Sequence, residues 1–115
     1  MAENKGVMVY CEVGEGKLAS IATEGLGIGR KLADNSGQEL CAVVVGSGVS
    51  DAAKEAIAYG ADKAYVIDDE LLKIYQSDPY AAVMEKVINQ ITPQVIILGQ
   101  NDIGRDLAQR LALFP

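Results

Sequence analysis

The stretch VIILGQNDIGRDLAQRLALFP, residues 95–115, decides the fold class that we expect for this chain. Its first five residues are apolar and largely β-branched, and they predict a strand over 95–99. A polar turn containing glycine follows, and apolar residues then recur at helical spacing, which predicts a helix over 103–114. The inward face of that helix is assigned to its apolar residues, which are Ile103, Leu107, Ala108, Leu111 and Ala112. A strand that leads directly into a helix is half of the β-α-β unit of a parallel sheet.

The rest of the chain repeats this alternation of strand and helix. Strands are predicted over 7–13, 40–46 and 64–68, and helices over 18–35, 51–60 and 80–91, with a short helix around 70–75. Ser50 and the segment 77–79 are expected to cap helices, and Gly37 to end the first one. Short connections favour right-handed crossovers and one domain over residues 1–115. We therefore expect an α/β fold: a three-layer parallel sheet with right-handed βαβ crossovers.

Composition restricts the functions that this domain can have. Half of the 115 residues are hydrophobic and 5% are aromatic, which favours an aliphatic core between helices and sheet. The net charge of −6 disfavours binding to a phosphate backbone, and the scarcity of aromatic side chains disfavours single-strand nucleic acid. The opening MAENKG does not resemble a signal peptide, and no apolar run is long enough to span a bilayer. We expect no membrane insertion and a cytoplasmic location.

The chain has no histidine and two cysteines. Without histidine, a His-based triad or a typical zinc site inside the chain is excluded, and we expect no metal. Cys11 and Cys41 both lie in apolar runs and are interpreted as buried structural thiols, with a disulfide as the minor alternative.

Two glycine-containing segments are candidates for phosphate-binding loops. GLGIG, residues 25–29, lies inside a predicted helix, so close packing of that helix on the sheet explains Gly25 and Gly29 better than a dinucleotide fingerprint. GSGVSD, residues 46–51, is better placed, because it joins a strand end to a helix N-terminus, where backbone N–H groups suit an anion. It lacks a P-loop lysine, and Asp51 adds negative charge at the helix start. A plain capped loop is therefore favoured over a nucleotide site.

The turn GQNDIGR, residues 99–105, also joins a strand end to a helix. Locally, Asp102 is expected to cap the helix, and Asp106 to pair with Arg110 four residues later. Residues at the two strand ends are the weak candidates for cofactor binding, and none is proposed as catalytic: Gly46, Ser47, Gly48, Gln100, Asn101, Asp102, Gly104 and Arg105.

The segment VIILGQNDIGRDLAQRLA resembles a motif of the electron-transfer flavoprotein alpha subunit, in its N-terminal domain. The residues that match the family pattern are Gly99, Gly104, Arg105, Asp106, Leu107, Ala108, Arg110, Leu111 and Ala112. VYCEVGEGKL, GRKLADNSG, LCAVVVG and GADKAYVIDDELLKIYQSDPYAAVMEKVI are similar to the family as well. The resemblance covers essentially the whole chain and implies an adenine-nucleotide-alpha-hydrolase-like (Rossmann-like) fold that is truncated here.

The resemblance implies a role in electron transport. Family members form a heterodimer of alpha and beta subunits that carries electrons, through FAD, between dehydrogenases such as acyl-CoA dehydrogenases and an acceptor. FAD is held mainly in a later domain, so this segment is expected to be a non-catalytic scaffold that is colourless by itself. Its partner would be the beta subunit. The alternative is a free-standing nucleotide-binding domain of universal-stress type, although the chain lacks the glycine-rich phosphate loop of that class.

The truncation implied by the resemblance leads to one more expectation. A helix that should cross to a further strand leaves an unpaired sheet edge and apolar side chains without cover. We expect self-association with residues 107–115 at or near the contact, including Leu111, Leu113 and Phe114.

Overall fold

Four parallel strands form the central sheet, in the order β5-β4-β1-β6. The computed structural model describes residues 5–112. The strands of the central sheet are β1 (Val7–Cys11), β4 (Leu40–Gly46), β5 (Lys63–Asp68) and β6 (Val95–Ile97). The helices are α1 (Ser20–Ser36), α2 (Ser50–Ala58), the 3₁₀ helix η1 (Glu70–Leu72), α3 (Ser77–Ile91) and α4 (Asp102–Ala112). This confirms the predicted α/β fold with a mostly parallel sheet.

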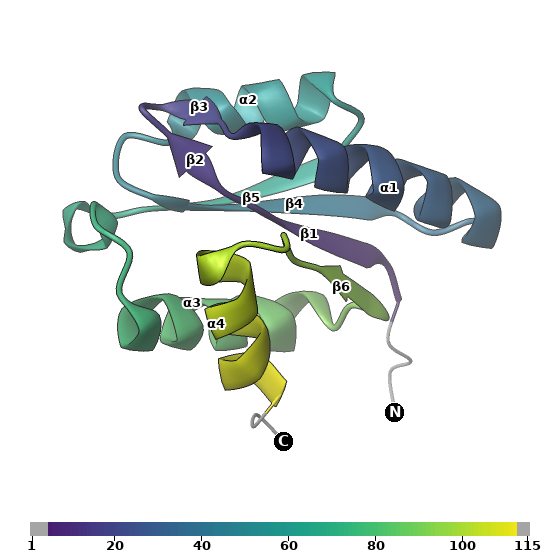
Figure 1. Cartoon of the computed structure of the whole chain (residues 1–115). Coiled ribbons are helices and arrows are strands. Elements are labelled where there is room, and N and C mark those ends of the chain that lie inside the picture. The colour runs from purple at the N-terminus through teal and green to yellow at the C-terminus, as the bar shows by residue number, and fades with distance from the viewer. Residues whose placement is uncertain (1–4, 113–115) are drawn as a thin grey trace.

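The helices form two layers with the sheet between them. Helices α1 and α2 cover one face, and α3 and α4 cover the other (Figure 1). Strand β4 is buried along its whole length, as expected for a central parallel strand. None of the helices within residues 5–112 is long and apolar enough to cross a membrane.

Two glycines let α1 lie directly on the sheet. A Cβ at Gly29 would come within 2.8 Å of Leu40 Cδ1 and 2.9 Å of Val9 Cγ2, and a Cβ at Gly25 within 3.2 Å of Val9 Cγ1. The close-packing interpretation of GLGIG is therefore confirmed. Helix α1 ends as predicted, because Gly37 takes a left-handed conformation with φ of 67°.

A small hairpin between β1 and α1 was missed by the sequence analysis, which gave one strand over 7–13 and a turn over 14–17. Strands β2 (Val13–Gly14) and β3 (Lys17–Leu18) pair antiparallel. The two residues between them, Glu15 and Gly16, both have positive φ, as a tight hairpin turn requires. The Leu18 N–H donates to Glu55 Oε1 at 3.0 Å and fastens the hairpin to α2.

Four local predictions need correction. Ser50 is the first residue of α2 and not its cap, because its hydroxyl donates to Asp68. The predicted helix around 70–75 is reduced to the single turn η1, and β6 stops at Ile97, short of residue 99. Ala108 is exposed and does not belong to the inward face of α4. The predicted helix end at 113–114 lies outside the described residues, as do Leu113 and Phe114 of the expected self-association contact.

Candidate functional site

The predicted site residues lie at the carboxyl edge of the sheet, where open α/β sheets bind ligands next to the point at which strand order reverses. In this sheet that point lies between β1 and β6. One group of candidates, Gly46, Ser47 and Gly48, ends β4 and leads to α2. The other group follows β6 and opens α4; it consists of Gln100, Asn101, Asp102, Gly104 and Arg105. Because β1 separates β4 from β6, the two groups do not adjoin in the sheet.

The loop between β4 and α2 holds a carboxylate of the chain itself. The Gly48 N–H donates to Asp68 Oδ1 at 2.8 Å, and the Val49 N–H donates to Asp68 Oδ2 at 3.2 Å. The Ser50 hydroxyl donates to Asp68 Oδ2 at 3.3 Å. Asp68 is the last residue of β5 and reaches this loop from the neighbouring strand. The donors that a nucleotide phosphate would use at the start of α2 are thus engaged by Asp68.

Asn101, and not Asp102, caps α4. The Gly104 N–H donates to Asn101 Oδ1 at 2.9 Å, which satisfies one of the free amides of the first turn. The Asn101 Nδ2 donates to Glu12 Oε2 at 2.6 Å. Glu12 directly follows β1, so this amide joins the ends of β1 and β6 at the point where strand order reverses. The prediction that Asp102 caps the helix was wrong.

The glycines of the family motif bring α4 against the end of β6. A Cβ at Gly104 would overlap the carbonyl oxygen of Gly99, and a Cβ at Gly99 would come within 2.5 Å of Ile21 Cδ1. A side chain at Gly104 would require the backbone to move, and one at Gly99 would require the Ile21 side chain on α1 to shift. The spacing of these two glycines therefore has a packing explanation within the domain.

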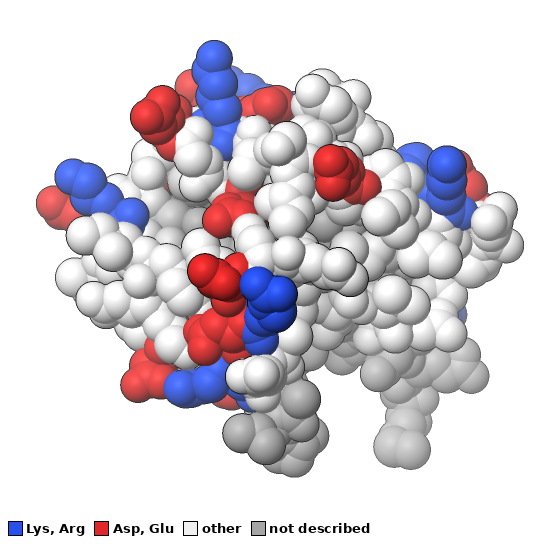
Figure 2. All heavy atoms as spheres, in the orientation of Figure 1, with Lys and Arg blue, Asp and Glu red and all other residues white. Residues whose placement is uncertain are grey.

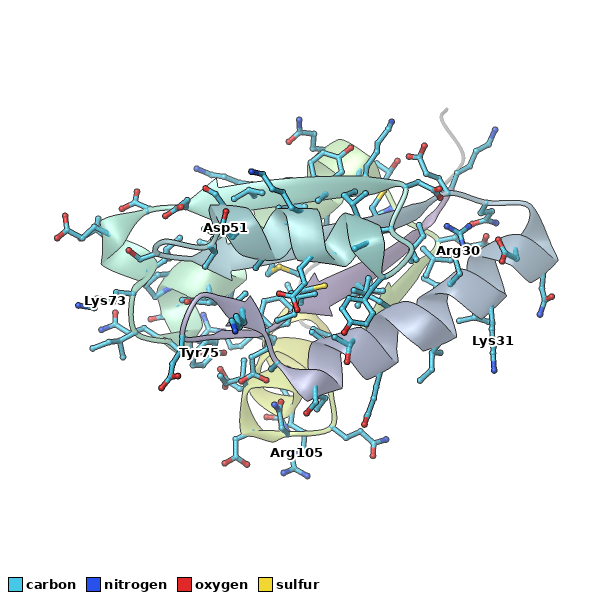
Figure 3. The ribbon with its side chains drawn as sticks, turned by 90° about the horizontal axis from the view of Figure 1, so that it is seen from above. Arg30, Lys31, Asp51, Lys73, Tyr75 and Arg105 are labelled. Carbon is cyan, nitrogen blue, oxygen red and sulfur yellow. The ribbon has the colours of Figure 1, made fainter. Side chains whose placement is uncertain are left out.

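The charged residues of α4 pair differently from the prediction. Arg110 contacts Asp78 of α3 at 2.6 Å, and Asp106 accepts from the Tyr75 hydroxyl at 2.5 Å, so the predicted pair of Asp106 with Arg110 is replaced by contacts to other elements. The hydrogen bond from Tyr75 lowers the pKa of Asp106. Arg105 contacts Asp102 at 3.2 Å, remains largely exposed and points away from the sheet (Figure 3). Acidic side chains gather over the beginning of α4, with a basic side chain beside them (Figure 2).

Three tyrosines, Tyr10, Tyr75 and Tyr80, lie close together on the face of the sheet that α3 and α4 cover. They were not among the residues predicted for the site. The rings of Tyr75 and Tyr80 meet edge to face with centroids 4.7 Å apart, and the Tyr80 hydroxyl donates to the Leu72 carbonyl at 2.6 Å. Tyr10 of β1 is 6% exposed. Burial raises the pKa of Tyr10. Together with Glu12 and Lys73 the tyrosines line a small pocket of about 200 Å³.

Gln100 lines a larger pocket of about 420 Å³ between α1 and β6. Its walls are mainly apolar and include Ile21, Ile28 and Ile97. The volume falls at the low end of the range for small-molecule sites, which is roughly 300–1,000 Å³. No group of three or more Cys, Asp or Glu side chains in the described part of the chain is arranged to hold a metal ion.

Both cysteines are free thiols buried in the sheet, as predicted. Burial raises the pKa of the Cys11 thiol to about 12. Burial, followed by the nearby Glu39 carboxylate, raises the pKa of the Cys41 thiol to about 11. Both thiols are therefore protonated near neutral pH, which removes the nucleophilic thiolate form.

Comparison with known proteins supports the resemblance found in the sequence. Residues 7–114 match the family described as "Electron transfer flavoprotein domain". The chain belongs to the electron transfer flavoprotein family. It is 40% identical over 112 residues to the electron transfer flavoprotein subunit alpha of Thermoanaerobacterium thermosaccharolyticum, covering 97% of this chain and 34% of that protein. It is 43% identical over 112 residues to the subunit alpha of Megasphaera elsdenii, covering 97% of this chain and 33% of that protein.

A third relative of this flavoprotein-family chain carries a different name. The acryloyl-CoA reductase electron transfer subunit beta of Anaerotignum propionicum is 44% identical over 108 residues, covering 94% of this chain and 29% of that protein. The chain thus spans about a third of the length of each of these relatives.

Proposed function

We propose that this chain is the N-terminal scaffold domain of an electron-transfer flavoprotein alpha subunit. In the complete subunit it would support the FAD-binding domain and meet the beta subunit, and the heterodimer would carry electrons between dehydrogenases, acyl-CoA dehydrogenases among them, and an acceptor. The family membership and the two relatives named subunit alpha support this proposal. The universal-stress alternative is not favoured by these relatives.

The observation that carries the scaffold role is that the loop before α2 binds the carboxylate of Asp68, the last residue of β5. In a nucleotide-binding α/β domain the amides at this position face a phosphate group. Here Gly48, Val49 and Ser50 all donate to Asp68, which supplies the negative charge from within the domain. The loop therefore stabilises the fold.

FAD, which the family implies, does not fit the strand-end residues of this chain. The pyrophosphate of FAD would compete with Asp68 at α2 and would meet Asp51 in the first turn of that helix. At α4, the Gly104 N–H is bound to Asn101, and Asp102 adds another carboxylate. We propose that the flavin is held elsewhere in the subunit, and that this domain supports the flavin-binding domain without contacting the cofactor.

The apolar pocket beside Gln100 supports a role in intrasubunit packing. Strand β6 has one neighbour, β1, among the described strands, so its other edge and the adjoining pocket wall are free to receive further chain. The relatives are about three times as long as the match. We propose that the remainder of the subunit pairs with β6 and covers Ile28 and Ile97. The cytoplasmic location stays a prediction.

The scaffold role is tested by titrating FAD, and separately AMP, into the purified chain. The chain has five tyrosines and no tryptophan, so tyrosine fluorescence reports binding near the cluster at the carboxyl edge. We expect no saturable change with either compound and no flavin absorption after gel filtration. Stoichiometric retention of FAD would contradict a pure scaffold, and saturable AMP binding would favour the nucleotide-binding alternative.

A further inference from the structure

Strand β5 is an edge strand that has β4 as its single neighbour among the described residues. In a parallel ladder, alternate residues direct both backbone groups toward the same neighbour. The Val7 N–H bonds the Glu39 carbonyl, so odd-numbered residues of β4 face β1 and even-numbered ones face β5. The Asp69 N–H accordingly bonds the Gly46 carbonyl. Ala64, Val66 and Asp68 therefore present their N–H and C=O groups to the free edge.

We propose that a second copy of this chain adds its own β5 antiparallel to this edge, with the two-fold axis through Val66. Val66 then pairs with Val66 of the second copy, and Ala64 pairs with Asp68 of the second copy. In this register every outward-facing backbone group of the three residues meets a partner, and directly opposed residues point to the same face of the joined sheet. A register shifted by one residue is excluded, because it would pair residues whose side chains point to opposite faces of the joined sheet.

The side chains at the edge are complementary under the same two-fold axis. Lys63, which contacts Glu39 of its own chain at 3.3 Å, lies opposite Asp69 of the second copy, whose carboxylate also accepts from its own Leu71 N–H. The symmetric pair repeats this arrangement at the other end. Both residues are exposed and near the ends of the strand, so the pairs favour this register over others without burying a charge. Val66, which is 40% exposed in the single chain, is covered by its symmetry mate.

Exposed apolar side chains flank both ends of β5 and meet in the pair. Leu71 and Ile74 follow the strand and are 84% and 73% exposed. Ile57, on α2, and Tyr59, directly after α2, precede the strand and are about half exposed. Antiparallel pairing brings the segment after β5 of one copy beside the segment before β5 of the other. In an isologous interface, the apolar residues after β5 of one copy lie against the apolar residues before β5 of the other, and the two-fold axis repeats this contact at the other end. This pairing does not depend on the electron-transfer role.

Sedimentation of the full 115-residue chain at about 100 μM tests the association. We expect a mass twice the 12.2 kDa of the single chain. Val66→Lys places two ammonium groups at the two-fold axis and is expected to give a monomer. The control Ile28→Lys changes an exposed apolar residue of α1 that lies beside β6, at the opposite edge of the sheet, and is expected to remain a dimer. A monomeric unsubstituted chain, or a dimer that Val66→Lys leaves intact, would overturn the proposal.

Cross-linking tests the register. Opposed residues of a hydrogen-bonded antiparallel pair have Cα atoms about 5.5 Å apart, within the range of a disulfide. Under mild oxidation Val66→Cys is expected to form a covalent dimer at least about tenfold faster than the control Ile28→Cys, because pairing raises the local thiol concentration. Cys11 and Cys41 are buried and do not compete. A dimer in sedimentation without faster cross-linking at residue 66 would overturn the strand pairing.

Discussion

Gly104 lies against the carbonyl oxygen of Gly99 so closely that no Cβ can stand between them. The contact closes the turn from β6 into α4 and sets the direction in which the helix leaves the sheet. Asn101 completes the turn, because its side chain holds the Gly104 N–H from one side and Glu12 from the other. The turn thus ties the ends of two neighbouring strands to one helix.

Gly104→Ala is expected to destabilise the domain by about 3 kcal/mol, because the added methyl group must push α4 away from the strand end. The measurement is urea unfolding followed by circular dichroism. Gly27→Ala is the matched control: it also replaces a helical glycine, but a Cβ there meets open space. It should stabilise the domain by about 0.5–1 kcal/mol. Equal effects of the two substitutions would refute the close-contact explanation.

Asn101→Ala is expected to cost about 1–2 kcal/mol, because it removes the cap of α4 and the link to Glu12. Asp102→Ala removes an exposed carboxylate whose contact is to Arg105, and should cost less than about 0.5 kcal/mol. Thermal melts of the two variants separate the roles of these adjacent residues. A larger loss of stability for Asp102→Ala than for Asn101→Ala would contradict this assignment and would mean that Asp102 caps the helix, as the sequence predicted.

Cys11 and Cys41 are expected to react slowly with thiol reagents in the native state at pH 8. Burial keeps both protonated and inaccessible, so labelling should follow unfolding events. The measurement is the rate of labelling with and without denaturant, with mass spectrometry to locate the label. Rapid stoichiometric modification without denaturant would contradict the buried environment.

Stability is expected to fall between pH 8 and pH 10. The thiol pKa values are raised in the folded state, to about 12 and about 11, above their ordinary value of 9.0. As pH rises above 9 the unfolded chain loses thiol protons that the folded chain retains, so unfolding becomes more favourable, by about 1 kcal/mol per thiol at pH 10. Urea midpoints at both pH values measure this. Cys41→Ala should remove about half of the fall that the two thiols cause. Tyr10, Tyr75 and Tyr80, whose pKa values are also raised in the folded state, add to the fall in the same direction. A midpoint that rises with pH would contradict the sign.

Elements with strong local patterns were predictable from the sequence. The strand LCAVVVG is apolar throughout, and the structure places β4 at the predicted residues 40–46. Gly25 and Gly29 were recognised as packing glycines because their spacing places them on one side of a helix, and Gly37 ends that helix as expected.

The details that failed depend on distant partners. Asn101 and Asp102 are both good helix caps, and the choice between them is fixed by Glu12, which lies 89 residues away in sequence. Asp68 reaches the loop before α2 from another strand, which no local pattern reveals. Asp106 and Arg110 have the spacing of an ion pair, yet Tyr75 and Asp78 hold them instead. In each case a contact with a residue distant in sequence replaces the contact that the local sequence pattern predicts.

The most direct measurement of the scaffold role is a domain exchange. This chain replaces the matching third of the Megasphaera elsdenii subunit alpha, and the chimera is produced together with its beta subunit. We predict a heterodimer with the flavin content of the unaltered protein, because the shape of the domain and not a cofactor contact is what it contributes. A chimera with Gly104→Leu should fail to assemble and controls for the turn geometry. A correctly folded chimera that forms no heterodimer, or forms one that has lost its flavin, would contradict the account.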